Sequence, residues 1–153
     1  MTLHDETSHG RVHAYTYSHS EALSKAAGNS TLTCHMKTRE TIERYYRTLR
    51  NKSEWDSLFA DDVTFTSFTS PNRQINARSA FVEGTRRFYS MIVSFELREL
   101  IIDGDKACGL VRYELQPPND GPRFSSDVAE IFAVRDGKIT SFGIYFDTAP
   151  YPK

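Results

Sequence analysis

The fold is decided by the stretch EIFAVRDGKI, residues 130–139, which carries β-branched and aromatic residues on both sides of a compact turn. Side chains of a strand alternate between its two faces, and Gly137 can take the positive φ that a tight hairpin connection requires. We therefore expect two antiparallel strands here, at about 125–135 and 138–146.

Two more strands precede this hairpin, at about 95–102 and 106–116, and Asp103-Gly104-Asp105 forms a second compact turn between them. A longer loop rich in Pro and Gly, residues 117–122, joins the two hairpins. The second half of the chain is therefore expected to be almost entirely sheet.

Helical periodicity appears upstream of these strands. Apolar residues at i, i+3, i+4 and i+7 predict an amphipathic helix that begins after Met36. Thr38 can cap the start of this helix and Asn51 its end. The periodic positions are Ile42, Tyr45, Tyr46 and Leu49.

Shorter elements connect this helix to the hairpins. Ser53 with Asp56 resembles a capping box that opens a short helix over residues 55–59, and Asp61-Asp62 end it. Residues 63–68 then alternate as a strand with Val63, Phe65 and Ser67 on one face. A turn at 70–72 and an extended piece near Ile75 come next, and Asn76 can cap a third helix. That helix carries a stripe of Phe81, Thr85, Phe88 and Ile92. Helices first and hairpin strands afterwards predict an α+β fold with the helices on one face of the sheet.

Composition narrows the class of protein. The 153 residues are 39% hydrophobic and 25% charged, which fits one globular domain rather than a disordered chain. A net charge of -1 gives no attraction to phosphate backbones or acidic membrane surfaces, so nucleic acid and membrane partners are not expected. No window reaches the ~18 apolar residues of a membrane helix, and residues 1–10 lack the apolar core of a signal peptide. We expect a cytoplasmic protein whose two cysteines, Cys34 and Cys108, are reduced.

Residues 1–35 differ from the rest and are interpreted as an N-terminal arm, partly ordered or docked, before a domain at 36–150. The arm is rich in Ser, Thr, His, Ala and Gly, and a short helix over residues 20–27 is possible within it. It contains all five histidines of the chain. The spacings of His4, His9, His13 and His19 place no consistent pair on one helix face, so no metal site is expected.

Three segments carry a resemblance to a known family: LFADDVT at 58–64, EIFAVRDGKI at 130–139 and IYFD at 144–147. They are similar to the nuclear-transport-factor-two-like superfamily, and specifically to its SnoaL-like branch, over residues 38–149. This superfamily also contains ketosteroid isomerases and limonene epoxide hydrolases. The resemblance implies a cone-shaped α+β barrel, a curved mixed sheet wrapped around an apolar pocket and closed by N-terminal helices. It also implies a homodimer, and it implies no single activity.

Two catalytic positions of ketosteroid isomerase have matching residues in this sequence, and a third does not. Tyr45 falls where that enzyme has its oxyanion-hole tyrosine, and Glu130 falls at or next to its partner carboxylic acid. Ser67 stands where the proton-shuttling aspartate would be. Steroid isomerisation by the usual route is therefore not expected.

The resemblance to limonene epoxide hydrolase is also incomplete. Arg112 and Glu114 resemble its Arg-x-Asp pair, with Glu in place of Asp. Phe65 and Ser67 replace the Tyr and Asn that position water, and Ile144 replaces the second catalytic Asp.

Strand alternation places Glu130 independently of the family. If Phe142, Ile144 and Phe146 line one face of the last strand, the neighbouring strand presents Glu130 inward among apolar side chains. The inward neighbours are Val128, Phe132 and Val134. Desolvation raises the pKa of such a carboxyl, so it can serve as a proton or hydrogen-bond donor near neutral pH.

Two other candidates keep alternative interpretations. If Arg112 and Glu114 face inward they can pair in the pocket and activate water, whereas an outward position makes them a solvated pair. Tyr45 is either a second donor beside Glu130 or ordinary core. Pocket walls are expected from Trp55, Phe65, Ser67, Phe88, Phe132, Phe142 and Ile144.

These patterns favour a small enzyme that performs acid/base chemistry, without metal or organic cofactor, on an apolar cyclic or terpenoid-like molecule. Its reaction would be of isomerase, cyclase or hydrolase type, with Glu130, Tyr45, Arg112 and Glu114 as catalytic candidates. One alternative is an epoxide hydrolase variant, and another is a non-catalytic small-molecule-binding or dimerisation module. We expect the dimer surface to use Val111, Tyr113 and Leu115 on the second face of the sheet.

Overall fold

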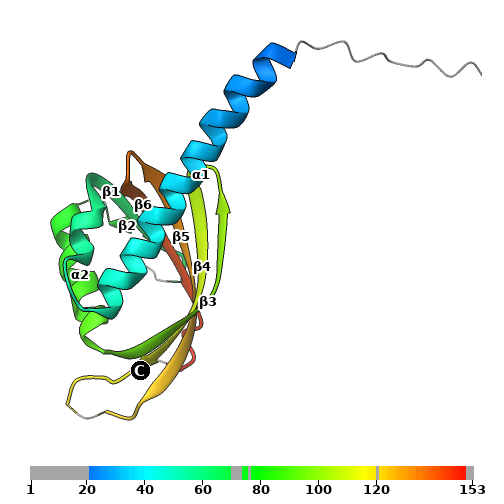
Figure 1. The fold of residues 1–153 in the computed structure, drawn as a ribbon. Helices are drawn as coiled ribbons and strands as arrows, with labels where there is room; N and C mark the ends of the chain where they lie inside the picture. Colours follow the sequence, from blue (N-terminus) through cyan, green and yellow to red (C-terminus); the bar gives the residue numbers. More distant parts are fainter. Residues whose placement is uncertain (1–20, 70–73, 76, 120, 151–153) are drawn as a thin grey trace, which may run out of the picture.

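The computed structural model describes residues 21–69, 74–75, 77–119 and 121–150, with side chains from Leu32 onward (Figure 1). Among the described residues, the longest helix comes first and four long strands come last. The elements are α1 (Glu21–Arg50), the 3₁₀ helix η1 (Trp55–Leu58), β1 (Phe59–Ser67), β2 (Gln74–Ile75), α2 (Arg78–Ser90), β3 (Ile92–Asp103), β4 (Lys106–Leu115), β5 (Phe124–Arg135) and β6 (Lys138–Phe146). The expected α+β order of elements is confirmed.

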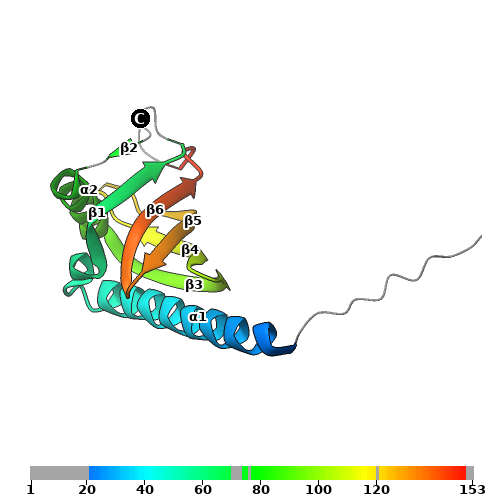
Figure 2. The same ribbon diagram turned by 90° about the horizontal axis from the view of Figure 1, so that it is seen from above.

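One strongly curved sheet organises the molecule (Figure 2). Its strand order is β2-β1-β6-β5-β4-β3, and every neighbouring pair is antiparallel except β1 with β6, which is parallel. The sheet is therefore mixed, as expected, and α1 and α2 pack against one side of it (Figures 1 and 2).

The two long hairpins have the turns that the sequence indicates. Gly104 and Gly137 have φ of 60° and 73°, a backbone region that glycine enters without steric cost. Beyond the turns, the register places Gly109 of β4 opposite Glu130 of β5, and Glu130 opposite Ile144 of β6. Glu130 thus lies on a central strand, near the middle of the curved sheet.

The core lies between the inner face of the sheet and the helices. Its centre is aromatic: Phe132 and Phe142 stack with ring centroids 5.1 Å apart, and Tyr45 meets Phe132 edge-to-face at 5.4 Å. Aromatic rings of this kind bury large apolar areas and hold defined orientations. The core therefore supplies a rigid wall for the cavity described below.

Helix α1 differs from its expected form. It is continuous from Glu21 to Arg50, so the expected separate start after Met36 is wrong, and so is the role of Thr38 as a cap. Thr38 is instead buried in mid-helix and donates through Oγ1 to the Gly104 carbonyl at 2.9 Å. The Gly104 N–H donates to Nε2 of His35 at 3.1 Å. The division of the chain into an arm at 1–35 and a domain at 36–150 stays a prediction.

Three local expectations also fail or fall elsewhere. The capping box at Ser53 and Asp56 is absent, because η1 is preceded by Glu54 in a left-handed conformation without a side-chain cap. Strand β1 begins at Phe59 and includes the Asp61-Asp62 pair that was expected to end a helix. Ile92 begins β3 rather than closing the stripe of α2. The capping role of Asn76 and the turn at 70–72 lie outside the described residues.

Candidate functional site

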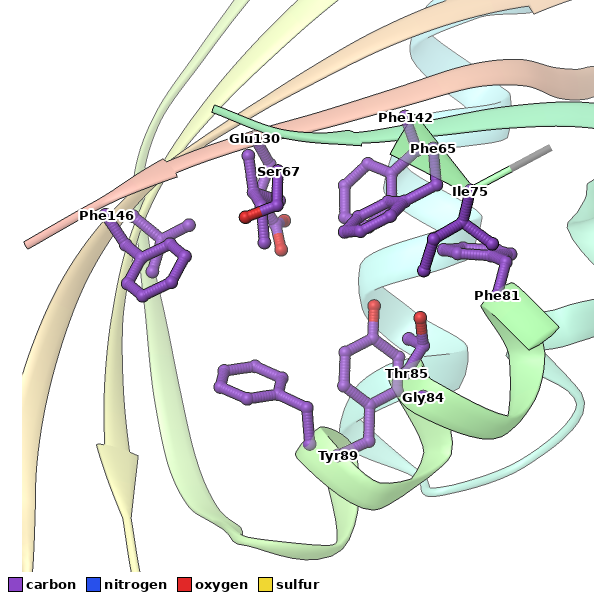
Figure 3. Close-up of a pocket in the computed structure, with 13 residues that line it drawn as sticks. Phe65, Ser67, Ile75, Phe81, Gly84, Thr85, Tyr89, Glu130, Phe142 and Phe146 are labelled. Atoms are coloured by element: carbon purple, nitrogen blue, oxygen red, sulfur yellow. The ribbon is translucent and has the colours of Figure 1, made fainter. Parts of the chain in front are cut away.

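A cavity of about 260 Å³ lies between the sheet and α2 (Figure 3). Its walls are mostly aromatic and aliphatic, with a few polar groups set among them. It is lined by Phe65, Ser67, Ile75, Phe81, Gly84, Thr85, Phe88, Tyr89, Val128, Glu130, Phe142, Ile144 and Phe146. A concave, largely apolar site with few polar groups is typical of small-molecule binding.

Glu130 is the acidic residue of this cavity wall, and its side chain is only 2% exposed. Each carboxyl oxygen accepts a phenol hydrogen bond of 2.8 Å: Tyr46 donates to Oε2 and Tyr113 to Oε1. Burial raises the pKa of Glu130 from 4.5 to about 7, although the two tyrosine hydrogen bonds oppose this rise. The expected inward position of Glu130 is confirmed, and burial shifts its pKa in the expected direction.

The tyrosines around Glu130 remain protonated donors. Burial, together with the nearby Glu130 carboxyl, raises the pKa values of Tyr46 and Tyr113 well above the ordinary value of 10. Phenols in this state donate and do not carry charge near neutral pH. Two neutral donors that do not line the cavity therefore bind the carboxyl oxygens, while the Glu130 side chain borders the cavity.

A second polar group approaches from the opposite wall. Figure 3 shows Glu130 and Ser67 on the sheet side of the cavity, with Thr85 and Tyr89 rising from α2. The Tyr89 hydroxyl forms a hydrogen bond with the hydroxyl of Tyr45. Tyr45 is 0% exposed and does not line the cavity, so it can act on a ligand only through Tyr89.

Five of the seven residues expected to form pocket walls line the cavity: Phe65, Ser67, Phe88, Phe142 and Ile144. Trp55 lies behind Tyr89, with ring centroids 4.8 Å apart, and lines a different hollow. Phe132 is buried in the core between Tyr45 and Phe142.

The Arg112 and Glu114 side chains lie outside the cavity. Arg112 pairs with Asp127 at 3.0 Å and with Glu114 at 3.6 Å, and these side chains are 37% to 58% exposed. The outward alternative of the sequence interpretation is therefore the correct one. Arg112 and Glu114 therefore do not join Glu130 in the cavity to activate water, as an epoxide hydrolase variant would require.

The opposite face of β4 points inward, which corrects the expected dimer surface. Val111, Tyr113 and Leu115 are 0% to 2% exposed and belong to the core. Alternation allowed either face of β4 to be the inner one. Burial of the three apolar residues is more favourable than burial of Arg112 and Glu114 would be, and this difference decides which face of β4 points inward.

Sequence reasoning missed Tyr46 and Tyr113 as partners of Glu130. Both hydroxyls reach the carboxyl across long sequence separations, from α1 and from β4. One signal was available: Tyr113 stands between Val111 and Leu115, and an apolar stripe of this kind predicts an inward face. An inward Tyr113 one strand away from Glu130 is within reach of its carboxyl group.

The described residues contain no group of three or more His, Cys, Asp or Glu side chains that could hold an ion. His4, His9, His13 and His19 lie outside the described part of the chain. Cys34 and Cys108 are both free thiols.

None of the helices in the described ranges is long and apolar enough to cross a membrane.

Comparison with known families agrees with this geometry. A model of the SnoaL-like domain matches residues 42–142. The chain belongs to this family. The match contains Glu130, Tyr46, Tyr113 and Tyr89, so the SnoaL-like domain includes every polar group described around the cavity wall. No curated protein matches the sequence.

Solved structures with the same fold include proteins named for different activities. An NTF2-like protein from Burkholderia thailandensis E264 is 22% identical, with a TM-score of 0.64 over 74% of this chain and 92% of that one. A candidate SnoaL-like polyketide cyclase from Jannaschia sp. CCS1 is 10% identical, with a TM-score of 0.63 over 74% and 88%. An LEH-like epoxide hydrolase from M. tuberculosis is 21% identical, with a TM-score of 0.62 over 76% and 86%. At these identities the likeness establishes the SnoaL-like fold and leaves the activity open.

Proposed function

We propose that this SnoaL-like protein is a small enzyme that performs acid/base chemistry on an apolar molecule bearing at least one oxygen function. The observation that carries the proposal is Glu130, a carboxyl 2% exposed in an apolar cavity wall with a pKa raised to about 7. A group whose pKa lies near the working pH both accepts and returns a proton readily. Perturbed carboxyls of this kind are concentrated at catalytic sites.

The reaction that best suits one such carboxyl is a proton transfer within the ligand, as in an isomerase or cyclase. Glu130 takes a proton from one atom of the ligand and returns it to another, so the enzyme ends each cycle unchanged. The outward position of Arg112 and Glu114 weighs against the epoxide hydrolase alternative.

Tyr89 is the second polar group that we assign to this chemistry. Either hydroxyl of the Tyr45–Tyr89 hydrogen bond can be the donor; in the arrangement that we propose, Tyr45 donates to the Tyr89 oxygen, and the Tyr89 proton is available to a ligand oxygen. A preorganised donor stabilises negative charge that develops on such an oxygen when Glu130 removes a proton. The part expected for Tyr45 thus passes to Tyr89, with Tyr45 as its support.

The size of the cavity limits the ligand. A buried apolar cavity of about 150 Å³ accommodates benzene, so one of about 260 Å³ suits a molecule of roughly ten carbon atoms. This supports a monocyclic or terpenoid-like ligand rather than one with four fused rings.

The test replaces Glu130 with Gln, which keeps the shape of the side chain and removes its ability to take up and return a proton. Incubation of the protein in D₂O with a panel of ten-carbon cyclic ketones and enones reports proton exchange as deuterium incorporation, measured by mass spectrometry. We expect the E130Q variant to lose about 10² to 10⁴ in exchange rate while ligand binding persists.

Two outcomes of this test would count against the proposal. Glu114→Gln on the outer face is the comparison, and a loss of rate in this variant instead would favour the epoxide hydrolase alternative. Binding of the ligand without any exchange or turnover in the wild-type protein would favour a non-catalytic binding module.

We also propose that the protein is a homodimer that uses the outer face of its sheet. With Val111, Tyr113 and Leu115 in the core, the exposed apolar residues of this face are Phe68, Ile101, Leu110, Ile131 and Tyr145. Isolated exposed apolar residues are ordinary, but a connected group of them is typical of an interface.

A further inference from the structure

The hydrogen-bond donors around Glu130 favour one of its two protonation states, whereas burial favours the other. An ionised carboxylate has two oxygens that both accept well, whereas a protonated carboxyl turns one oxygen into a hydroxyl, a weaker acceptor. Tyr46 and Tyr113 each donate to a different oxygen at 2.8 Å, so both oxygens are treated as acceptors. This arrangement suits the carboxylate better than the acid.

The bond from Tyr46 depends on a glycine. Gly109 lies directly opposite Glu130 in the β4–β5 register, and a Cβ atom at this position would overlap the Tyr46 hydroxyl oxygen. The Tyr46 ring has little room to move aside, because it is 4% exposed and packs edge-to-face against Tyr45 and Phe132. A side chain at position 109 would therefore displace the hydroxyl from the carboxyl.

We infer that Tyr46 and Tyr113 are positioning residues that hold Glu130 as a proton acceptor, and that Gly109 provides the space in which the Tyr46 hydroxyl reaches it. The inference rests on the proposed function in one respect, which is that a ligand supplies the proton. It deepens that function by making proton abstraction from the ligand the first step. The proton then resides on a Glu130 oxygen until it returns to the ligand, and no other reactant is required.

The titratable groups that face Glu130 are few. They are Tyr45 and Tyr46 from α1, Tyr89 from α2 and Tyr113 from β4; Cys108 lies on the outer face of β4 but is near enough for Glu130 to influence its pKa, as it does that of the four tyrosines. The β6 residue that pairs with it, Ile144, carries no titratable group. The pKa of Glu130 itself is set by burial and by the two tyrosine bonds, without a contribution from a charged side chain. Loss of either tyrosine hydroxyl should therefore be visible in its titration.

The test measures the Glu130 pKa directly, by NMR of ¹³C-labelled glutamate carboxyls, in the protein without ligand. We expect Tyr46→Phe and Tyr113→Phe each to raise this pKa by about one unit, since each removes a hydrogen bond that favours the ionised form. Gly109→Ala should raise it by a similar amount. In a Y46F background the G109A change should add little, because its effect acts through the Tyr46 hydroxyl.

Gly143→Ala is the matched control. Gly143 is also a strand glycine whose Cβ would meet an aromatic ring, at 2.9 Å from Phe68, but it lies on the outer face. This variant should leave the Glu130 pKa unchanged. The Y46F and Y113F variants are nearly isosteric with the native protein, so they carry the test if G109A does not fold.

An unchanged or lowered Glu130 pKa in Y46F and Y113F would overturn the inference. The result is independent of turnover and so separates the two proposals. Raised pKa values together with full deuterium exchange in E130Q would contradict the proposed function and leave the positioning role standing. Unchanged pKa values with an inactive E130Q variant would contradict the positioning role and leave the proposed function standing.

Discussion

A carboxyl that is buried without a cation contributes to stability with a sign opposite to that of a surface acid in an ion pair. The folded-state pKa of Glu130 is about 7, above its unfolded value of 4.5. Between these two pH values the folded protein binds more protons than the unfolded chain, so the free energy of unfolding falls as pH rises through this window. The cost of ionising Glu130 in the core is fully present only about one pH unit above its folded-state pKa.

We therefore predict a pH dependence that belongs to this one residue. The difference between 4.5 and about 7 corresponds to about 3 kcal/mol of unfolding free energy lost between pH 4.5 and 8. Urea denaturation at pH 5 and pH 8 measures it. E130Q should show a smaller decrease than the wild-type protein, whereas E114Q on the outer face should keep the wild-type decrease. Equal decreases in wild type and E130Q would contradict the prediction.

At this scale the sequence predicted Glu130 and missed its partners. Alternation along residues 128–134 was sufficient to place Glu130 inward, because apolar side chains surround it in the sequence itself. Tyr46 and Tyr113 are 84 and 17 residues away from it in the sequence; the apolar stripe around Tyr113 indicates an inward side chain, but no local pattern pairs either hydroxyl with Glu130. The resemblance also drew attention to Arg112 and Glu114, which lie on the face of β4 opposite to Tyr113.

Helices and strands differed in how far the sequence predicted them. The four long strands were placed within a few residues, because their turns contain glycines with positive φ. Helix α1 was predicted only from Met36, because residues 28–31, Gly-Asn-Ser-Thr, are weak helix formers and the amphipathic stripe starts later. Thr38, a good capping residue by type, forms a tertiary hydrogen bond instead.

That tertiary bond leads to a prediction for the element. Thr38 is 1% exposed, and its Oγ1 donates to the Gly104 carbonyl in the β3–β4 turn. Thr38→Val keeps the volume and removes the donor, so we expect a loss of about 1 kcal/mol in unfolding free energy. Thr48→Val is the control, since the Thr48 hydroxyl bonds only within α1, to the Tyr45 carbonyl. A T38V variant as stable as T48V in urea denaturation would show that the bond to the turn contributes nothing.

The two faces of the sheet have different compositions at the scale of the whole molecule. The inner face buries aromatic residues and Glu130, while the outer face exposes an apolar centre beside charged pairs. In the outer register, Ile101 pairs with Cys108, Cys108 with Ile131, and Ile131 with Gly143. A neighbouring row joins Leu110, Ala129 and Tyr145. The rings of Phe68 and Tyr145 stack with their centroids 4.0 Å apart. Arg98, Arg112 and Asp127 form ion pairs at the margin of this group.

An apolar centre with a charged margin is the composition of a protein–protein interface. Ile131 lies on β5, in the middle of the row, and is 39% exposed, so a second copy of the chain would cover it near the centre of the contact. Burying the ammonium group of a lysine at this position without a partner is costly, and removal of an interface anchor commonly costs 2 kcal/mol or more.

We therefore predict that the wild-type protein sediments as a dimer at micromolar concentration and that Ile131→Lys sediments as a monomer. Its dissociation constant should rise by about 30-fold or more, which corresponds to about 2 kcal/mol. Met36→Lys is the matched control, because Met36 is 66% exposed on α1 and lies away from the outer face of the sheet. This variant should remain a dimer.

Circular dichroism should show that both variants keep the wild-type fold, since each replaced side chain is exposed. A wild-type monomer at micromolar concentration, or equal dimerisation of wild type and I131K, would exclude this face as the interface, and its exposed apolar residues would then need another explanation.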